Sequence, residues 1–118
     1  MKRVRIAILS TSLFLAGCLS VWSPGEDPRG RELLVEGDRL VAALQQYRAA
    51  NGSYPAELAA LGSNIDLGRP GSDFYFSYDR DSDSYLLTVN YTPSWPQNGR
   101  VTCSRRHDSS EWGCHGYL

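Results

Sequence analysis

The sequence predicts an α+β domain in which one amphipathic helix and a short second helix pack on a small antiparallel sheet of three or four strands. Apolar residues recur at helical spacing across residues 31–50, and short aromatic and β-branched runs separated by turn residues follow. A helix laid across one face of a sheet buries both apolar surfaces together. A chain of 118 residues is long enough for one such domain and too short for two.

The first helix is expected over residues 31–50. Its apolar residues form one stripe along the helix: Leu33, Leu40, Val41, Leu44 and Tyr47. Asp27 is a candidate N-cap because Pro28 follows it, and proline is favoured at the first helical position. Gly52 is expected to end the helix, since glycine readily takes the left-handed conformation found there. Gly37 is unfavourable inside a helix, so it indicates either a close contact with another element or the point where the well-packed part of the helix begins.

Residues 53–62 indicate a second helix of one or two turns, opened by Pro55. A turn-rich loop follows, and the expected strands come after it: residues 74–78 and 85–91 as a hairpin, residues 100–104, and residues 112–117 as a final strand or extended tail. Two prolines within residues 92–99 exclude a central strand there.

The first 17 residues have the layout of an export signal peptide. Lys2, Arg3 and Arg5 precede an apolar stretch that ends in small residues. This stretch is shorter than the about 20 apolar residues that a transmembrane helix needs. Residues 1–17 are therefore expected to be removed, residues 18–30 to form a tether and residues 31–118 to form the domain.

The residues Leu15-Ala16-Gly17-Cys18 resemble the lipobox of bacterial lipoproteins. The resemblance implies that Cys18 receives fatty acyl chains and becomes the first residue of the mature protein. Two or three acyl chains hold a protein lastingly on a membrane. Leu19 stands where an aspartate would favour the inner membrane, so the resemblance implies the periplasmic face of the outer membrane. The alternative is an ordinary signal peptide with an incidental cysteine.

Residues 40–61 (LVAALQQYRAANGSYPAELAAL) resemble the core of type IV pilin-like proteins, especially the major pseudopilins of type II secretion. The matching positions are Tyr47, Asn51, Gly52, Tyr54, Pro55, Leu58 and Leu61. The resemblance implies a pilin-like domain. The family's long hydrophobic helix is not matched, because a lipobox stands in its place and glutamates interrupt the following segment. A pilin-like domain on a lipid anchor would not enter a filament in the usual way, and the calcium site of pseudopilins is not carried over.

Cys103 and Cys114 are expected to form a disulfide, because an exported protein meets an oxidising compartment and Cys18 is used for acylation. The alternative is a metal site that includes His107 and His115. Cys114 and His115 are adjacent, and successive side chains of a strand face opposite sides, so both are poorly placed to bind one ion. Catalysis by cysteine and histidine would need a free thiolate, which oxidation removes. No metal or other cofactor is expected.

Asp79, Asp81 and Asp83 resemble the opening of a calcium-binding loop. That loop requires glycine and a carboxylate at later positions, which are Ser84 and Asn90 here. The pattern favours a solvated hairpin tip, and weak calcium binding remains the alternative.

The composition and motifs favour a binding protein. The chain has 12 basic and 13 acidic residues, a balance that gives no electrostatic reason to expect a nucleic-acid partner. It lacks the common catalytic motifs of hydrolases and phosphate-binding enzymes. The candidate contacts for a protein partner are residue types enriched at interfaces: Trp95, Arg105, Arg106 and Trp112.

The sequence therefore predicts a non-enzymatic outer-membrane lipoprotein whose pilin-like domain is a binding or scaffolding module in the cell envelope, with a link to a secretion or assembly system. The alternative is an inhibitor or immunity-type lipoprotein that blocks a hydrolase or toxin in the periplasm.

Overall fold

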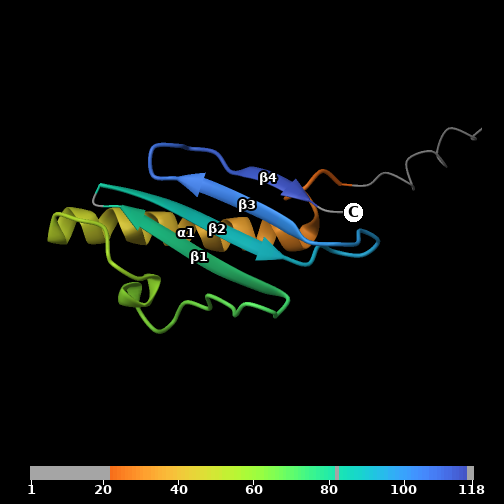
Figure 1. Ribbon diagram of the computed structural model, residues 1–118, viewed down its shortest axis with the longest axis horizontal. Coiled ribbons are helices and arrows are strands. Elements are labelled where there is room, and N and C mark those ends of the chain that lie inside the picture. The colour runs from red at the N-terminus through yellow and green to blue at the C-terminus, as the bar shows by residue number, and fades with distance from the viewer. Residues whose placement is uncertain (1–21, 82, 117–118) are drawn as a thin grey trace, which may run out of the picture.

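A computed structural model describes residues 22–81 and 83–116 (Figure 1). One α-helix, α1 (Pro28–Asn51), lies along one face of a four-stranded sheet. The strands are β1 (Phe74–Asp81), β2 (Ser84–Tyr91), β3 (Val101–Arg106) and β4 (Gly113–Gly116), each antiparallel to the next in chain order. The α+β class, the long helix and the antiparallel sheet are confirmed. The expected signal peptide, Cys18 and Tyr117 lie outside the described residues.

Both caps of α1 are formed as the sequence indicates. The Asp27 side chain accepts a hydrogen bond from the Gly30 N–H, and the N–H of Gly52, at φ 82°, donates to the Arg48 carbonyl. The helix begins at Pro28, so residues 28–30, which were assigned to the tether, are helical. Gly25 and Asp27 are also buried, which shows that the packed domain begins before residue 31. The prediction from local pattern alone placed this boundary too late.

The expected second helix over residues 53–62 is not an α-helix. Only a single 3₁₀ turn, η3 (Leu58–Leu61), forms there, and only Leu58 of this turn is buried. Four residues are too few for the repeated i to i+4 hydrogen bonds of an α-helix. The segment is instead held against β1, where the Tyr78 hydroxyl donates to the Pro55 carbonyl at 2.8 Å.

The β1–β2 hairpin is longer than predicted. Its ladder continues past Tyr78 through the pairs Asp79↔Leu86 and Asp81↔Ser84. The turn is therefore tight, and most of the polar residues expected in a six-residue loop belong to the strands. Since side chains alternate across a strand, this extension places polar side chains on both faces of the sheet.

The core lies between α1 and the inner face of the sheet. It is formed by apolar side chains from the helix, from the segment that follows it and from alternate positions of the three long strands: Leu33, Leu40, Val41, Leu44, Tyr54, Leu58, Phe76, Tyr85, Leu87, Val89, Tyr91, Val101 and Cys103. Four of the five residues in the predicted helical stripe are buried, and Tyr47 is half-buried. Gly37 allows a close contact, because a Cβ there would lie 2.5 Å from Trp112 Cζ2.

The predicted disulfide between Cys103 and Cys114 is confirmed. The two residues are register partners on β3 and β4, with their Cα atoms 4.0 Å apart. The bond fastens the short edge strand β4 to the rest of the sheet.

Candidate functional site

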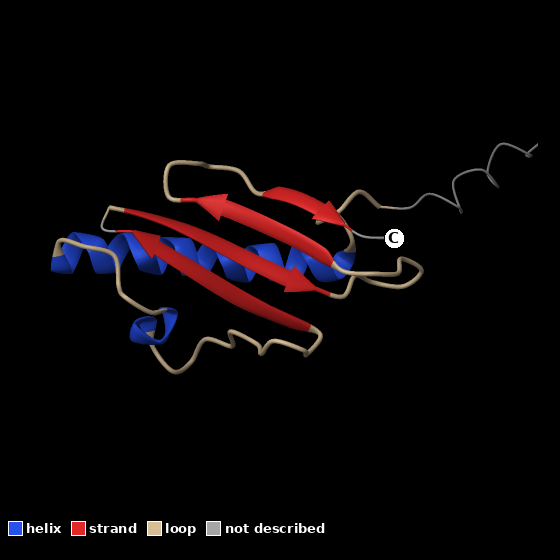
Figure 2. Cartoon of the chain, viewed as in Figure 1, coloured by secondary structure: helices blue, strands red, loops and turns tan. Residues whose placement is uncertain are grey.

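The long strands lie at a small angle to the helix axis, so most of the turns and loops between the strands lie at two ends of the molecule (Figure 2). We call one the N-terminal end; it comprises the leading segment (residues 22–27), the start of α1 and the loop of residues 92–100. We call the other the distal end; it comprises the β1–β2 turn and the loop of residues 107–112. The two ends differ in their polar groups: a buried carboxylate lies at the N-terminal end, and exposed charged side chains line a cleft at the distal end.

Asp27 is the centre of the N-terminal end. Its side chain is fully buried. One carboxylate oxygen accepts a hydrogen bond of 2.6 Å from the Tyr91 hydroxyl, and the other accepts bonds from the backbone N–H groups of Ser94 and Gly30. The Tyr91 hydroxyl in turn accepts a bond of 3.1 Å from the Gly25 N–H. One carboxylate thus joins the leading segment, α1, β2 and the loop after β2.

The ionised form of Asp27 is favoured despite its burial. Burial is the largest single influence and raises the pKa of Asp27, but the hydrogen bonds from Tyr91, Ser94 and Gly30 together outweigh it, and the pKa lies below its ordinary value. The pKa of Tyr91 is raised well above its usual range by burial and by its bond to Asp27. Tyr91 therefore stays protonated and can donate to Asp27 at all physiological pH values.

Two further contacts hold the leading segment in place. The Gln97 side-chain amide donates to the Trp22 carbonyl at 2.6 Å. Gly25, at φ 87°, packs on the disulfide, since a Cβ there would lie 2.6 Å from the Cys114 Sγ. The direction in which the chain enters the domain is therefore fixed from Trp22 onward.

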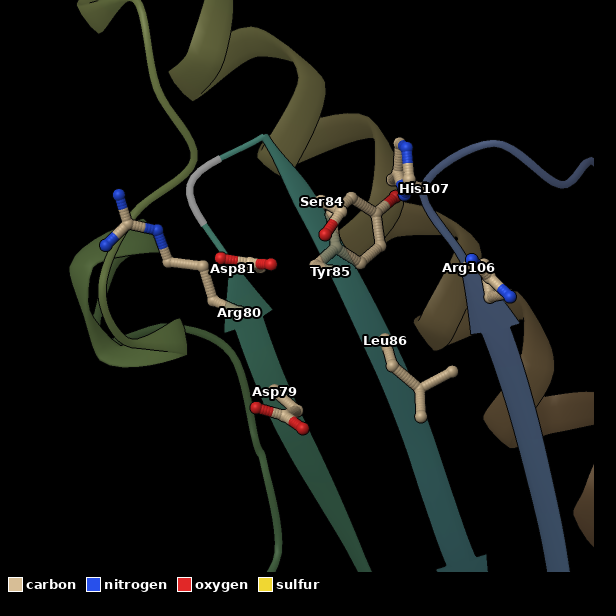
Figure 3. A pocket seen from close by; sticks show the side chains of 8 residues that line it. All are labelled: Asp79, Arg80, Asp81, Ser84, Tyr85, Leu86, Arg106 and His107. Carbon is tan, nitrogen blue, oxygen red and sulfur yellow. The ribbon is translucent and has the colours of Figure 1, made fainter.

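The distal end carries a cleft of about 530 Å³ (Figure 3). Its lining combines carboxylates, guanidinium groups, a hydroxyl and a histidine with the side chains of Tyr85 and Leu86. The complete lining is Asp79, Arg80, Asp81, Ser84, Tyr85, Leu86, Arg106 and His107. Such a surface offers charges of both signs around an apolar patch.

Leu86 is the apolar centre of this surface. It lies on the outer face of the sheet, the face that α1 does not cover (Figure 3), and it is 39% exposed. Asp79 and Arg106 are its register partners on the two neighbouring strands, so an acidic, an apolar and a basic side chain form one row across the sheet. Leu86 and Arg106 also line a second cleft of about 480 Å³ toward β4. Arginine is among the residue types enriched at protein contact surfaces, whereas a single exposed leucine is common on any protein surface, so Arg106 and the two clefts mark this face as a candidate contact surface.

His107 lies at the edge of the first cleft, where the tyrosines of the core hold it. Its backbone N–H donates to the Tyr85 carbonyl, and its ring meets the rings of Tyr54 and Tyr85 edge to face. Its Nδ1 is 4.0 Å from the Asp108 carboxylate, which is too far for a hydrogen bond. The imidazole therefore packs against the tyrosine rings at this end of the core.

The residues singled out as candidate partner contacts lie in three different places. Arg105 and Trp112 point to the helix side, where both donate to the Asp38 carboxylate at 3.0 and 2.8 Å. They clamp the loop of residues 107–112 onto α1. Arg106 is exposed on the outer face beside Leu86, and Trp95 belongs to the loop of residues 92–100 at the N-terminal end. Arg106 alone belongs to the distal cleft.

The acidic residues of the β1–β2 hairpin do not converge on one point. Asp79 and Asp81 belong to β1, and Asp83 lies in the turn. Within residues 22–81 and 83–116 there is no group of three or more His, Cys, Asp or Glu side chains that could hold a metal ion.

Leu86 was missed as a candidate contact in the sequence, although the signal for it is present. Leu86 and Leu87 are adjacent in a strand, and side chains alternate across a strand, so one of the two must face away from the core. For Asp27 the sequence indicates only the N-cap. Its hydrogen bonds with Tyr91 and Ser94 could not be predicted, because these residues lie 64 and 67 positions further along the chain.

Comparison with known proteins gives no relative: no protein-family model, curated protein or solved structure matches the chain. Among the described helices, none combines the length and the apolar character needed to cross a membrane.

Proposed function

We propose that this protein is a non-enzymatic lipoprotein, anchored through Cys18 to the periplasmic face of the outer membrane, whose pilin-like domain binds a protein of the cell envelope. The lipobox motif Leu15-Ala16-Gly17-Cys18 supports the anchor. The order of a long helix, an irregular segment with Tyr54-Pro55 and an antiparallel meander supports the pilin-like assignment. A link to a secretion or assembly system is the partner class that this resemblance favours.

The observation that carries the proposal is the placement of the leading segment and the distal cleft at opposite ends of the molecule (Figure 1). The chain from Cys18 enters the domain at Trp22, where Gln97 and the Asp27 network hold it. An anchor at this end would leave the Leu86 surface directed away from the lipid. The polar outer face of the sheet would then be accessible to a partner in the periplasm.

A photo-crosslinking amino acid at position 86 tests this function in cells that produce the full chain. We expect one defined protein to be captured at position 86. The matched control is the same crosslinker at position 35, because Val35 is 51% exposed on α1, away from the cleft. Equal capture at both positions, or none at position 86, would contradict the proposal. Mass spectrometry of the mature N-terminus, with separation of the two membranes, tests the anchor and the location.

The inhibitor or immunity function remains the second candidate because the loop of residues 107–112 is held rigidly. The disulfide encloses it, and Arg105 and Trp112 fix it to Asp38. A preorganised loop loses little conformational entropy on binding, as inhibitor loops require. The identity of the captured protein separates the two functions: a secretion or assembly component supports the first, and a single hydrolase or toxin supports the second.

A further inference from the structure

Trp95 is the most exposed large hydrophobic residue among those the structure describes. The residue is 87% exposed, compared with 51% for Val35 and 39% for Leu86. An indole exposes a large apolar surface to water, and tryptophan is enriched where one side of a residue meets an apolar phase and the other meets water. Contact with an apolar surface, such as that of a membrane or another protein, would remove this indole from water.

The backbone on both sides of Trp95 is fixed to the beginning of the domain. Before it, the Ser94 N–H donates to Asp27, and the Ser94 Oγ accepts from the Arg29 N–H at 3.0 Å. After it, the Gln97 side chain donates to the Trp22 carbonyl. The loop thus presents Trp95 at a defined position next to the point where the chain enters the domain.

The chain between Cys18 and Trp22 is short. At no more than about 3.6 Å per residue, the four steps from residue 18 to residue 22 span at most about 14 Å. A lipid on Cys18 would therefore hold the N-terminal end of the domain, including the loop of residues 92–99, within reach of the headgroups.

The loop that carries Trp95 is itself suited to the boundary of a lipid leaflet. Residues 92–99 (TPSWPQNG) contain no charged side chain, and neither do residues 19–25 (LSVWSPG). Arg100 follows the loop, but its guanidinium is directed back to its own chain, where it donates to Asn90, Ser72 and Thr92. No charge within the loop has to lose its water when the indole enters the headgroup region.

We propose that Trp95 inserts into the headgroup region of the same leaflet that receives the Cys18 lipid, so that the protein rests on the membrane at two points. This inference depends on the lipid anchor of the proposed function. It adds a second, protein-based contact, which restricts how the domain tilts on the membrane and keeps the distal end away from the lipid.

The experiment uses full-length protein, lipidated in cells and reconstituted into vesicles that contain phospholipids brominated in the upper part of their acyl chains. Three single-tryptophan proteins are compared, with phenylalanine replacing the other two tryptophans. We expect the fluorescence of Trp95 and of Trp22 to be quenched by about half, and that of Trp112, which packs on Gly37, to be nearly unchanged. Quenching of Trp22 alone, or equal quenching of Trp112, would overturn the inference.

A second comparison leaves Trp22 and Trp112 in place. Because Trp95 is exposed, Trp95→Phe should not disturb the fold, so the difference in quenching between the unmodified protein and this variant reports Trp95 alone. No difference would overturn the inference. Mass spectrometry of the same samples separates the two proposals: a lipidated Cys18 with unquenched Trp95 overturns only the inference, whereas an unlipidated Cys18 overturns the anchor and, with it, the inference.

Discussion

The carboxylate that holds the N-terminal end together is buried, whereas the paired carboxylates at the distal end, Asp38 and Asp108, are exposed. Asp27 is fully buried and accepts hydrogen bonds from three different segments. The ion pair of Arg106 and Asp108 at the distal end has side chains that are 70% and 60% exposed, and such pairs contribute little to stability. Buried networks of this kind fix one geometry, while exposed charges can exchange partners. This difference is compatible with the proposed function, in which the N-terminal end is attached to the membrane and the distal end binds a partner.

The largest expected effect comes from removing the buried carboxylate. Asp27→Ala leaves the Tyr91 hydroxyl and two backbone N–H groups without their acceptor, and we expect the free energy of unfolding to fall by ~3–5 kcal/mol. Urea denaturation measures the change. Glu26→Ala is the matched control, because Glu26 is exposed and adjacent, and it should change stability by less than about 0.5 kcal/mol. Similar losses in both variants would show that the N-terminal end does not depend on this network.

Reduction of the disulfide should have the next largest effect. The bond closes a loop with a sequence separation of 11, and its loss should lower the free energy of unfolding by about 3 kcal/mol. Because Gly25 packs on the Cys114 Sγ, we also expect faster hydrogen exchange at the leading segment after reduction. Hydrogen exchange with mass spectrometry measures this. An unchanged leading segment would mean that the N-terminal end is independent of β4.

Gly37→Ala tests the contact between α1 and the base of the distal loop. The added Cβ would lie 2.5 Å from Trp112, so we expect a loss of about 1–3 kcal/mol despite the higher helix propensity of alanine. The same substitution in a Trp112→Ala background should be neutral or stabilising. Thermal or urea unfolding of the four proteins of this cycle gives the coupling. Additive effects would show that the indole does not occupy this position.

Acid should remove the contribution of Asp27 to stability. The pKa of Asp27 is lower in the folded protein than in the unfolded chain, so its contribution to stability is complete above the unfolded pKa of about 3.9 and is lost as the pH falls through the lower folded value. Asp27→Asn should therefore show a smaller loss of stability than the unmodified protein between about pH 5 and pH 2. Unfolding free energies across this range measure the difference. Parallel curves would show that Asp27 is not the group responsible.

The smallest effect on stability is expected at the distal end. Leu86→Ser and Arg106→Ala each alter exposed side chains, and we expect changes within about 0.5 kcal/mol. Both should nevertheless reduce capture of the partner at a neighbouring crosslinking position. Stability and capture are measured on the same variants, with Val35→Ser as the control that changes neither. Loss of stability with retained capture would reverse the roles assigned to the two ends.

Sequence patterns predicted the features that depend on neighbouring residues. The stripe from Leu33 to Leu44 predicted α1, Asp27 was a candidate N-cap although the helix was expected only from residue 31, and the aromatic and β-branched runs predicted the hairpin. The disulfide followed from the number of cysteines and the expected compartment. These features rest on helical or strand periodicity and on local capping, which a single segment carries in full.

Features that depend on distant residues were not predicted. Nothing in the sequence near Asp27 indicates that Tyr91 and Ser94 complete its hydrogen bonds, or that Asp38 receives both Arg105 and Trp112. For the same reason Arg105 and Trp112 were grouped with Arg106, although β3 directs adjacent side chains to opposite faces. The candidate partner surface was therefore predicted only in part, through Arg106.

The length of α1 sets a limit on what the distal end can meet. The helix has 24 residues, and at 1.5 Å per residue it is about 36 Å long. With Trp22 close to the lipid, the Leu86 surface would stand no further from the bilayer than this length and a few side chains allow. If the protein is anchored as proposed, a binding partner would have to approach the membrane to that height, which favours proteins that are themselves membrane-bound or that bridge the periplasm.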